Sequence, residues 1–163
     1  MAQPNFNDNV KALAKQVTIR GIRFERGEME FFGKKAEDKP DVVEITLGAA
    51  GVKSPDLPRH VRAVIDCSVV AFPSAAKERR LARMMARVVL EYEVSSQELF
   101  DSLNDVDMSS FAGLNGAFNA WPYLREYFQS SSARMNVGTF ILPALRVENG
   151  DIRPSGTNVA GKP

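Results

Sequence analysis

The stretches VRAVIDCSVVA (residues 61–71) and ARMMARVVLEYEV (residues 82–94) decide the fold. In each of them apolar side chains recur at every second position, which is the period of a half-buried β-strand. The apolar face of the first stretch is Val61, Ala63, Ile65, Cys67, Val69 and Ala71, and that of the second is Ala82, Met84, Ala86, Val88, Leu90, Tyr92 and Val94. Because Pro73 and Ser74 end the first strand, the two are predicted to form a long antiparallel hairpin over about 59–72 and 82–94.

Two more strands are predicted on the N-terminal side of this hairpin. Residues 17–24, VTIRGIRF, carry β-branched and aromatic side chains at intervals, and residues 41–47, DVVEITL, alternate before Gly48. The segment 26–41 between them is rich in Gly, Lys, Asp and Pro, so we expect a polar loop that carries Met29, Phe31 and Phe32. Four strands without intervening helices favour an antiparallel sheet.

The spacing becomes helical after Val94. Ser95 and Ser96 are placed to cap a short turn at 97–100, and Ser109 and Ser110 to cap a longer helix. The large apolar side chains of that helix are Phe111, Leu114, Phe118 and Trp121. Pro122 is expected to break or restart it, with a second helical part up to Met135 and an extended segment over 141–147.

The predicted fold class is therefore α+β, with a four-stranded antiparallel sheet followed by two helices packed on one face. A length of 163 residues suits one domain with a sizeable core. We expect a single domain over 1–163, with its core at about 14–147 and flexible tails at 1–10 and 150–163.

Composition limits the class of partner. The formal net charge of +1 gives no global field that would gather nucleic acid or an anionic membrane. The sequence has one basic cluster, formed by Lys77, Arg79, Arg80, Arg83 and Arg87. Because Glu78 and Glu91 reduce its positive charge, an exposed hairpin turn explains it better than a contact with nucleic-acid phosphates. The lone Cys67 favours a cytosolic protein, and the sequence contains neither a secretion-signal pattern at its start nor an apolar run long enough to span a membrane.

The sequence gives little support for catalysis. A nucleophilic triad would have to use His60, the only histidine, and no HxxxH, CxxC or EF-hand spacing is present for a metal. Gly113 and Gly116 lack the context of a phosphate-binding loop. The carboxylates fall at positions expected to face water: Glu25, Glu28, Glu30, Glu91 and Glu93. We therefore predict a binding protein without a cofactor or a metal.

Two features suggest binding surfaces. The aromatic residues offer more large apolar surface than a sheet with one helical layer obviously needs: Phe31, Phe32, Trp121, Tyr123, Tyr127 and Phe128. Burial in the core is an equal alternative for each of them. A stripe of small residues on the first helix suits either internal packing or a subunit contact: Ala112, Gly113, Gly116, Ala117 and Ala120.

The runs WPYLREYF (121–128), ARM (133–135) and FILP (140–143), together with GIRFE (21–25), resemble the SecB family of protein-export chaperones. The order of elements is similar over about residues 14 to 147. The resemblance implies a homotetramer, built as a dimer of dimers, whose hydrophobic grooves hold unfolded polypeptides before translocation. It implies groove residues at Phe24, Phe31, Phe32, Leu47, Trp121, Tyr127, Phe128 and Leu142, and a tetramer interface at Ala112, Gly113, Gly116 and Ala117. A leucine at Gly116 is then expected to dissociate the assembly.

The chain also departs from the family. SecB members are strongly acidic and dock the SecA motor through carboxylates on the sheet, whereas this chain is nearly neutral. Glu25 matches one docking position, but Gly21 and Arg87 stand at others, so electrostatic complementarity with SecA is doubtful. Two functions remain open: a general holdase for protein export, and a SecB-like chaperone for one client such as the antitoxin of a toxin–antitoxin system.

Overall fold

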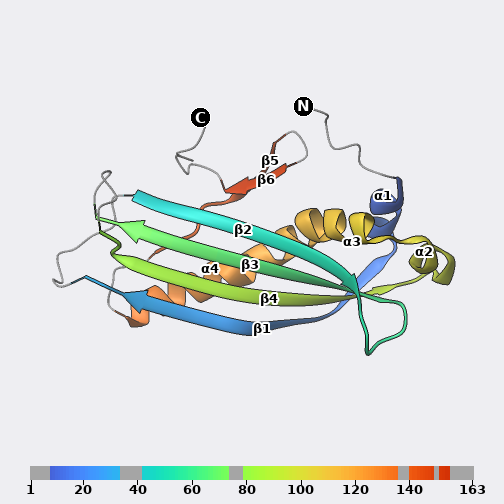
Figure 1. The fold of residues 1–163 in the computed structure, drawn as a ribbon, viewed down its shortest axis with the longest axis horizontal. Helices are drawn as coiled ribbons and strands as arrows, with labels where there is room; N and C mark the ends of the chain where they lie inside the picture. The colour runs from blue at the N-terminus through green and yellow to red at the C-terminus, as the bar shows by residue number, and fades with distance from the viewer. Residues whose placement is uncertain (1–7, 34–41, 74–78, 136–139, 149–150, 155–163) are drawn as a thin grey trace.

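The computed structural model describes residues 8–33, 42–73, 79–135, 140–148 and 151–154. Four long strands form one antiparallel sheet in the order β1-β4-β3-β2 (Figure 1). Their bounds are Val17–Phe31 for β1, Val42–Lys53 for β2, His60–Phe72 for β3 and Ala82–Val94 for β4. The central pair is the hairpin that the alternating sequences predict.

The register of the central hairpin explains why the alternation is so regular. β3 and β4 pair from His60 with Glu93 to Ala71 with Ala82, without a bulge. Along β3, every second side chain from Val61 to Ala71 is buried, and the residues between them are only half-buried. One face of the sheet therefore carries the core.

The two edge strands are longer than the sequence suggested. Residues 26–31, expected to be a loop, continue β1 and pair with β4 as far as Phe31 with Ala82. In this part Met29 lies on the core face of the sheet, while Arg26, Glu28 and Glu30 lie on the opposite face. The charged residues that led to the prediction of a loop are therefore the solvent-facing side chains of a strand. β2 likewise passes Gly48 and runs to Lys53, because its pairing with β3 compensates for the low strand propensity of glycine.

The helices form a nearly continuous rod after a short capped helix. Ser96 caps α2 (Gln97–Ser102) through Leu99, as predicted. The long helix begins earlier than expected, since α3 (Asp105–Phe111) is capped by Asn104 in a capping box with Asp107 and not by the serines at 109 and 110. It continues through a π-helical turn, η1 (Ala112–Gly116), into α4 (Ala117–Arg134). Pro122 lies inside α4 and does not divide it.

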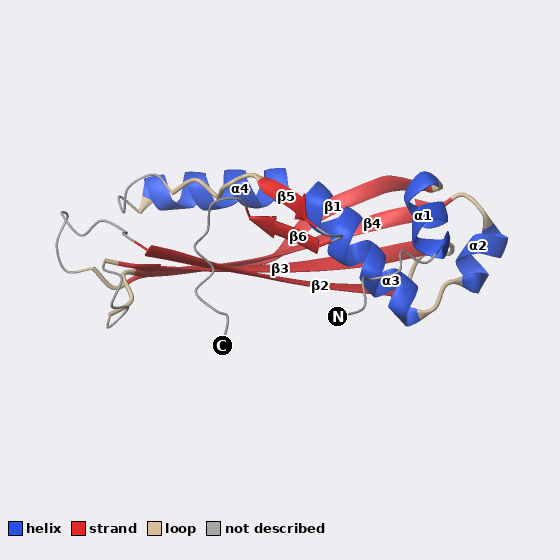
Figure 2. Ribbon diagram, turned by 90° about the horizontal axis from the view of Figure 1, so that it is seen from above, coloured by secondary structure: helices blue, strands red, loops and turns tan. Residues whose placement is uncertain are grey.

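The layers agree with the predicted fold class. Figure 2 shows α4 and the small hairpin of β5 (Leu145–Glu148) and β6 (Asp151–Pro154) on the same side of the sheet. Within the described residues no helix covers the opposite side, which is called the open face below. The core is formed by the hairpin together with buried helix side chains: Leu13, Phe111, Ala117, Leu124 and Phe128.

The ends of the chain differ from the expected tails. Residues 8–10 belong to α1 (Asp8–Lys15), a helix that the sequence analysis did not predict, and its Val10 and Leu13 are buried. β6 occupies residues 151–154 of the expected C-terminal tail. Residues 1–7 and 155–163, the rest of both expected tails, lie outside the described residues.

Candidate functional site

An aromatic cluster joins β1 to the C-terminal half of α4. The ring centroids of Phe24 and Tyr127 are 5.1 Å apart, and those of Tyr127 and Phe128 are 5.5 Å apart in an edge-on arrangement. Phe128 is fully buried, Tyr127 is half-buried, and Phe24 is 41% exposed. The cluster thus passes from the core to an accessible ring at the edge strand of the sheet, and it unites three of the residues that the sequence analysis assigned to a groove.

Gly27 sets the position of this cluster. A β-carbon on Gly27 would collide with the hydroxyl and ring of Tyr127, so the phenol ring lies directly against the β1 backbone. The backbone of Gly27 has no positive φ, so the need for glycine here is steric and not conformational. Sequence patterning could not identify Gly27, because nothing in the local sequence shows which ring faces it.

Three more of the residues assigned to the groove lie outside this cluster. Phe31 is half-buried at the end of β1 and Phe32, which follows it, is exposed. Leu47 lies half-buried on β2, on the core face of the opposite edge strand. These residues keep accessible surface, and they are spread over both edges of the sheet.

Three of the residues assigned to the groove by resemblance are core residues. Trp121 is 4% exposed, and Phe128 and Leu142 are not exposed at all. This corrects the expectation that their side chains line an open groove. The physical reason is that the helical layer is only one helix thick over this part of the sheet, so Trp121 and Phe128 of α4 fill the core together with Leu142, which follows the helix.

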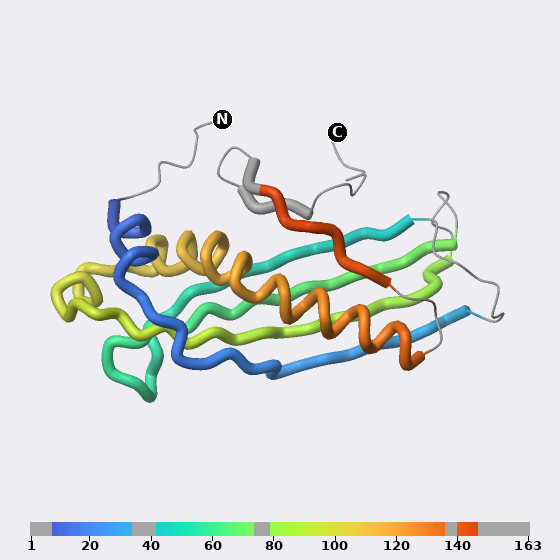
Figure 3. Tube along the Cα trace, turned by 180° about the vertical axis from the view of Figure 1, so that it is seen from behind, coloured from blue at the N-terminus to red at the C-terminus, as the bar shows by residue number. Residues whose placement is uncertain are grey.

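Residues 140–144, which we call the strap, run in extended form beside α4. Figure 3 shows the strap between α4 and β2, on the helical side of the sheet. The indole Nε1 of Trp121 donates a hydrogen bond to the Pro143 carbonyl at 2.9 Å. The Phe140 N–H donates to the Ser132 hydroxyl at 3.0 Å, and this hydroxyl donates in turn to the Gln129 carbonyl. The sequence predicts an extended segment here, and the two contacts to its backbone become visible only in the tertiary structure.

The small residues of the long helix are used inside the chain. Ala112, Gly116 and Ala117 are buried, and a β-carbon on Gly116 would stand 2.9 Å from the Ala63 β-carbon. The stripe therefore serves internal packing on the sheet, one of the two readings that the sequence left open, which corrects the assignment of these three residues to a tetramer interface. Gly113 differs, because a β-carbon there would meet nothing within 4 Å.

The long helix carries exposed apolar side chains, of which the sequence analysis named only Tyr123 as part of a binding surface. Val106 is among the most exposed apolar residues, and Phe118 and Tyr123 are also exposed. A β-carbon on Gly113 would also meet nothing within 4 Å, so this position is open as well.

The open face is covered by ion pairs. Glu91, only 6% exposed, accepts from Arg62 at 2.6 Å and lies 3.5 Å from Arg23. The Arg62 pKa is raised, chiefly by this hydrogen bond. Glu25, the residue that matches a SecA-docking position, is 2.8 Å from Arg23, so its charge is balanced within the chain.

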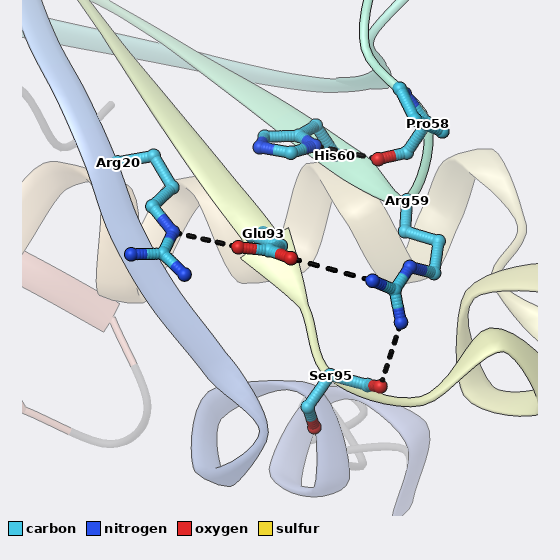
Figure 4. A network of polar contacts seen from close by, with 6 residues as sticks. All are labelled: Arg20, Pro58, Arg59, His60, Glu93 and Ser95. Atoms are coloured by element: carbon cyan, nitrogen blue, oxygen red, sulfur yellow. Dashed lines mark hydrogen bonds and ion pairs between the residues drawn. The ribbon is translucent and has the colours of Figure 1, made fainter.

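Asp66 and Glu93 form further ion pairs on this face. Arg87 makes paired hydrogen bonds to Asp66, which raise the Arg87 pKa. At the end of the sheet, Glu93 lies between Arg20 at 2.7 Å and Arg59 at 3.4 Å, and Arg59 also donates to the Ser95 carbonyl (Figure 4). The hydrogen bond from Arg20 is the main cause of the lowered Glu93 pKa. Arginines thus balance the charges of Asp66, Glu91 and Glu93 on the open face.

The groups that could perform chemistry are tied to structural roles. A ring nitrogen of His60, Nδ1, is 2.7 Å from the Pro58 carbonyl, at the start of β3 (Figure 4). Burial raises the pKa of the Cys67 thiol to about 12, which keeps it in the unreactive thiol form. Among the described residues there is no group of three or more His, Cys, Asp or Glu that could hold a metal ion. The described helices include none that is long and apolar enough to cross a membrane.

Comparison with known proteins identifies the architecture. No protein-family model matches the chain, and no curated protein matches it. Among solved structures, the chain resembles the SecB-like chaperone Rv1957 of Mycobacterium tuberculosis, solved in complex with a ChAD peptide from the Rv1956 HigA1 antitoxin. The TM-score is 0.73 at 18% sequence identity, over 86% of this chain and 98% of that one. The expectation of a divergent SecB-like fold is confirmed.

Proposed function

We propose that this SecB-like chain is a chaperone that binds extended, non-native polypeptide and serves a dedicated client such as an antitoxin. The observation that carries the proposal is the cluster of Phe24, Tyr127 and Phe128, in which a buried aromatic core continues into an exposed ring at the edge strand β1. Unfolded chains expose apolar side chains and unpaired backbone, and an aromatic surface beside a strand edge binds both.

Two observations favour a dedicated client over a general role in export. The similar chaperone Rv1957 was solved with a peptide from an antitoxin. In addition, arginines of the same chain pair with several carboxylates of the open face, as Arg23 with Glu25 and Arg87 with Asp66, and this reduces the negative charge that could attract a motor protein. The general holdase for export, with SecA as a partner, is the second candidate.

We further propose that the chain works as a homotetramer in the cytosol. The support for an assembly is that Val106 and Phe118 expose apolar side chains and that Gly113 has open space around it, since a subunit contact would cover such positions. A lone thiol such as Cys67 suits a reducing compartment.

Binding of a permanently unfolded protein tests the chaperone function. A reduced and carboxymethylated client, labelled for fluorescence anisotropy, should bind the wild-type chain, and Phe24→Ala should weaken binding by about tenfold, as expected for an aromatic anchor. Leu57→Ala is the control, because Leu57 has a similar exposed fraction, 43%, but lies in the loop between β2 and β3. Equal losses in both variants, or no binding at all, would refute the proposed surface.

Competition then separates the two client ranges. A dedicated chaperone should be displaced from its cognate antitoxin segment only by excess unfolded protein, whereas a general holdase should bind both with similar affinity. Similar affinities for several unrelated unfolded proteins and for the antitoxin segment would favour the role in export.

A further inference from the structure

The strap contacts α4 through backbone groups and one buried side chain, as an extended peptide bound to a protein does. Of its five residues, Leu142 is fully buried, Ile141 is 53% exposed, and Phe140 and Pro143 are half-buried. Among the described residues, the strap makes two hydrogen bonds, both with side chains of α4. The Trp121 indole donates to the Pro143 carbonyl, and the Phe140 N–H donates to the Ser132 hydroxyl. The strap therefore docks on the helix through one inserted side chain and two backbone groups, and not as a strand of the sheet.

The sequence of the strap suits this form of docking. Proline disfavours the helical conformation of the preceding residue, so Leu142 is biased toward an extended backbone. Pro143 itself has no N–H, so its carbonyl is the one backbone group at that position that needs a partner, and the Trp121 indole supplies it. An extended segment with a buried leucine is thus stabilised without any sequence-specific polar contact to its side chains.

We propose that the strap occupies a polypeptide-binding site in cis, and that an extended apolar segment of a client takes the same place when it binds. This inference rests on the proposed function. The site recognises features that any extended chain offers: a carbonyl for Trp121, an N–H for Ser132, and an apolar side chain in the position of Leu142. The strap is then a competitor for the client, and the exposed Phe24 with the half-buried Tyr127 beside it remains available for the first contact.

Hydrogen exchange provides a distinctive test, because ligand binding normally slows exchange at the site it covers. With the reduced and carboxymethylated client at saturation, amides of residues 140–146 should exchange faster than in the free protein, since the Phe140 N–H loses the Ser132 acceptor. Client binding is measured separately by anisotropy. Slower or unchanged exchange of the strap, with the client bound, overturns the inference and leaves the proposed function intact.

Variants of the strap give a second test. Leu142→Ser removes the inserted side chain, so a larger fraction of molecules has an open site, and client affinity should rise by about threefold or more. Ile141→Ser changes the neighbouring exposed side chain and should leave affinity unchanged. Leu13→Ala, in α1, removes an equally buried leucine elsewhere and controls for general destabilisation.

The outcomes are separable. Tighter binding by Leu142→Ser alone supports the strap as a competitor. Equal tightening by Leu13→Ala attributes the gain to loosening of the core and overturns the inference. Failure of the wild-type chain and of every variant to bind any client refutes the proposed function itself.

Discussion

The phenol ring of Tyr127 lies against the α-carbon of Gly27, with its hydroxyl where a β-carbon at position 27 would stand. This contact fixes the distance between α4 and β1, and it holds the Tyr127 ring 5.1 Å from that of Phe24. A position that sequence patterning treated as part of a polar loop therefore determines the geometry of the candidate binding surface.

Substitution of Gly27 should displace Tyr127 from the strand. Gly27→Ala is expected to lower the free energy of unfolding by about 1 kcal/mol, because the ring must move away and loses its packing against Phe24. Urea denaturation measures the change. Gly21→Ala on the same strand is the control, since a β-carbon there meets nothing within 4 Å. In a Tyr127→Ala background the cost of Gly27→Ala should disappear, and a cost that persists would show that the clash lies elsewhere.

The two glycines of the long helix should respond in opposite ways. Gly116→Leu is expected to destabilise the fold by about 1–3 kcal/mol, because the new side chain meets Ala63 and Ile65 of the same chain. Gly113→Leu has open space around it and should leave the unfolding free energy nearly unchanged, but it should dissociate an assembly built on the outer face of the helix. Light scattering and urea denaturation together check both. An unchanged mass for Gly113→Leu would exclude this face as the subunit contact.

Removal of the Glu91 charge should cost more stability than removal of an exposed charge on the same face. Glu91→Gln leaves the half-buried Arg62 with only the more exposed carboxylate of Asp56 as an anionic partner, and the loss is expected to be about 2 kcal/mol. Glu28→Gln breaks the exposed pair with Arg26 and should cost less than about 0.5 kcal/mol. Thermal or urea unfolding distinguishes them. Equal costs would mean that the burial of Glu91 adds nothing to the strength of its ion pair.

The Glu93 network should make stability depend on pH in the acidic range. The Arg20 hydrogen bond and the nearby cations lower the pKa of Glu93 from its ordinary value of 4.5 in the folded chain. Its contribution is therefore fully present above pH 4.5 and is lost as the pH falls through the lower, folded-state value.

Urea midpoints of the wild-type chain and of Glu93→Gln, measured from pH 7 down to pH 3, check this expectation. The wild-type chain should be more stable near neutral pH, and the difference should shrink as Glu93 becomes protonated. A difference that stays constant over the whole range would indicate that the ionisation of Glu93 is not linked to folding.

The local sequence was sufficient where burial follows a simple period. The alternation over Val61–Ala71 and Ala82–Val94 predicted the central hairpin, since each residue type there agrees with its position in the sheet. The Ser96 cap was predicted for the same reason, because a cap involves only neighbouring residues. The edge of the sheet was predicted too short, because the charged side chains of β1 follow the solvent face and resemble a loop when the partner strand is unknown.

The sequence by itself determined the strand and helix periods, the fold class and the aromatic composition from which the binding hypothesis arose. Only the tertiary structure decided which aromatic rings are consumed by the core and which stay accessible, because this depends on where α4 lies across the sheet. It placed Trp121, Phe128 and Leu142 inside, left Phe24 and Phe32 exposed, and turned Gly116 toward its own sheet. Burial is set by contacts between residues distant in the chain, and a local pattern records only that a side chain is apolar.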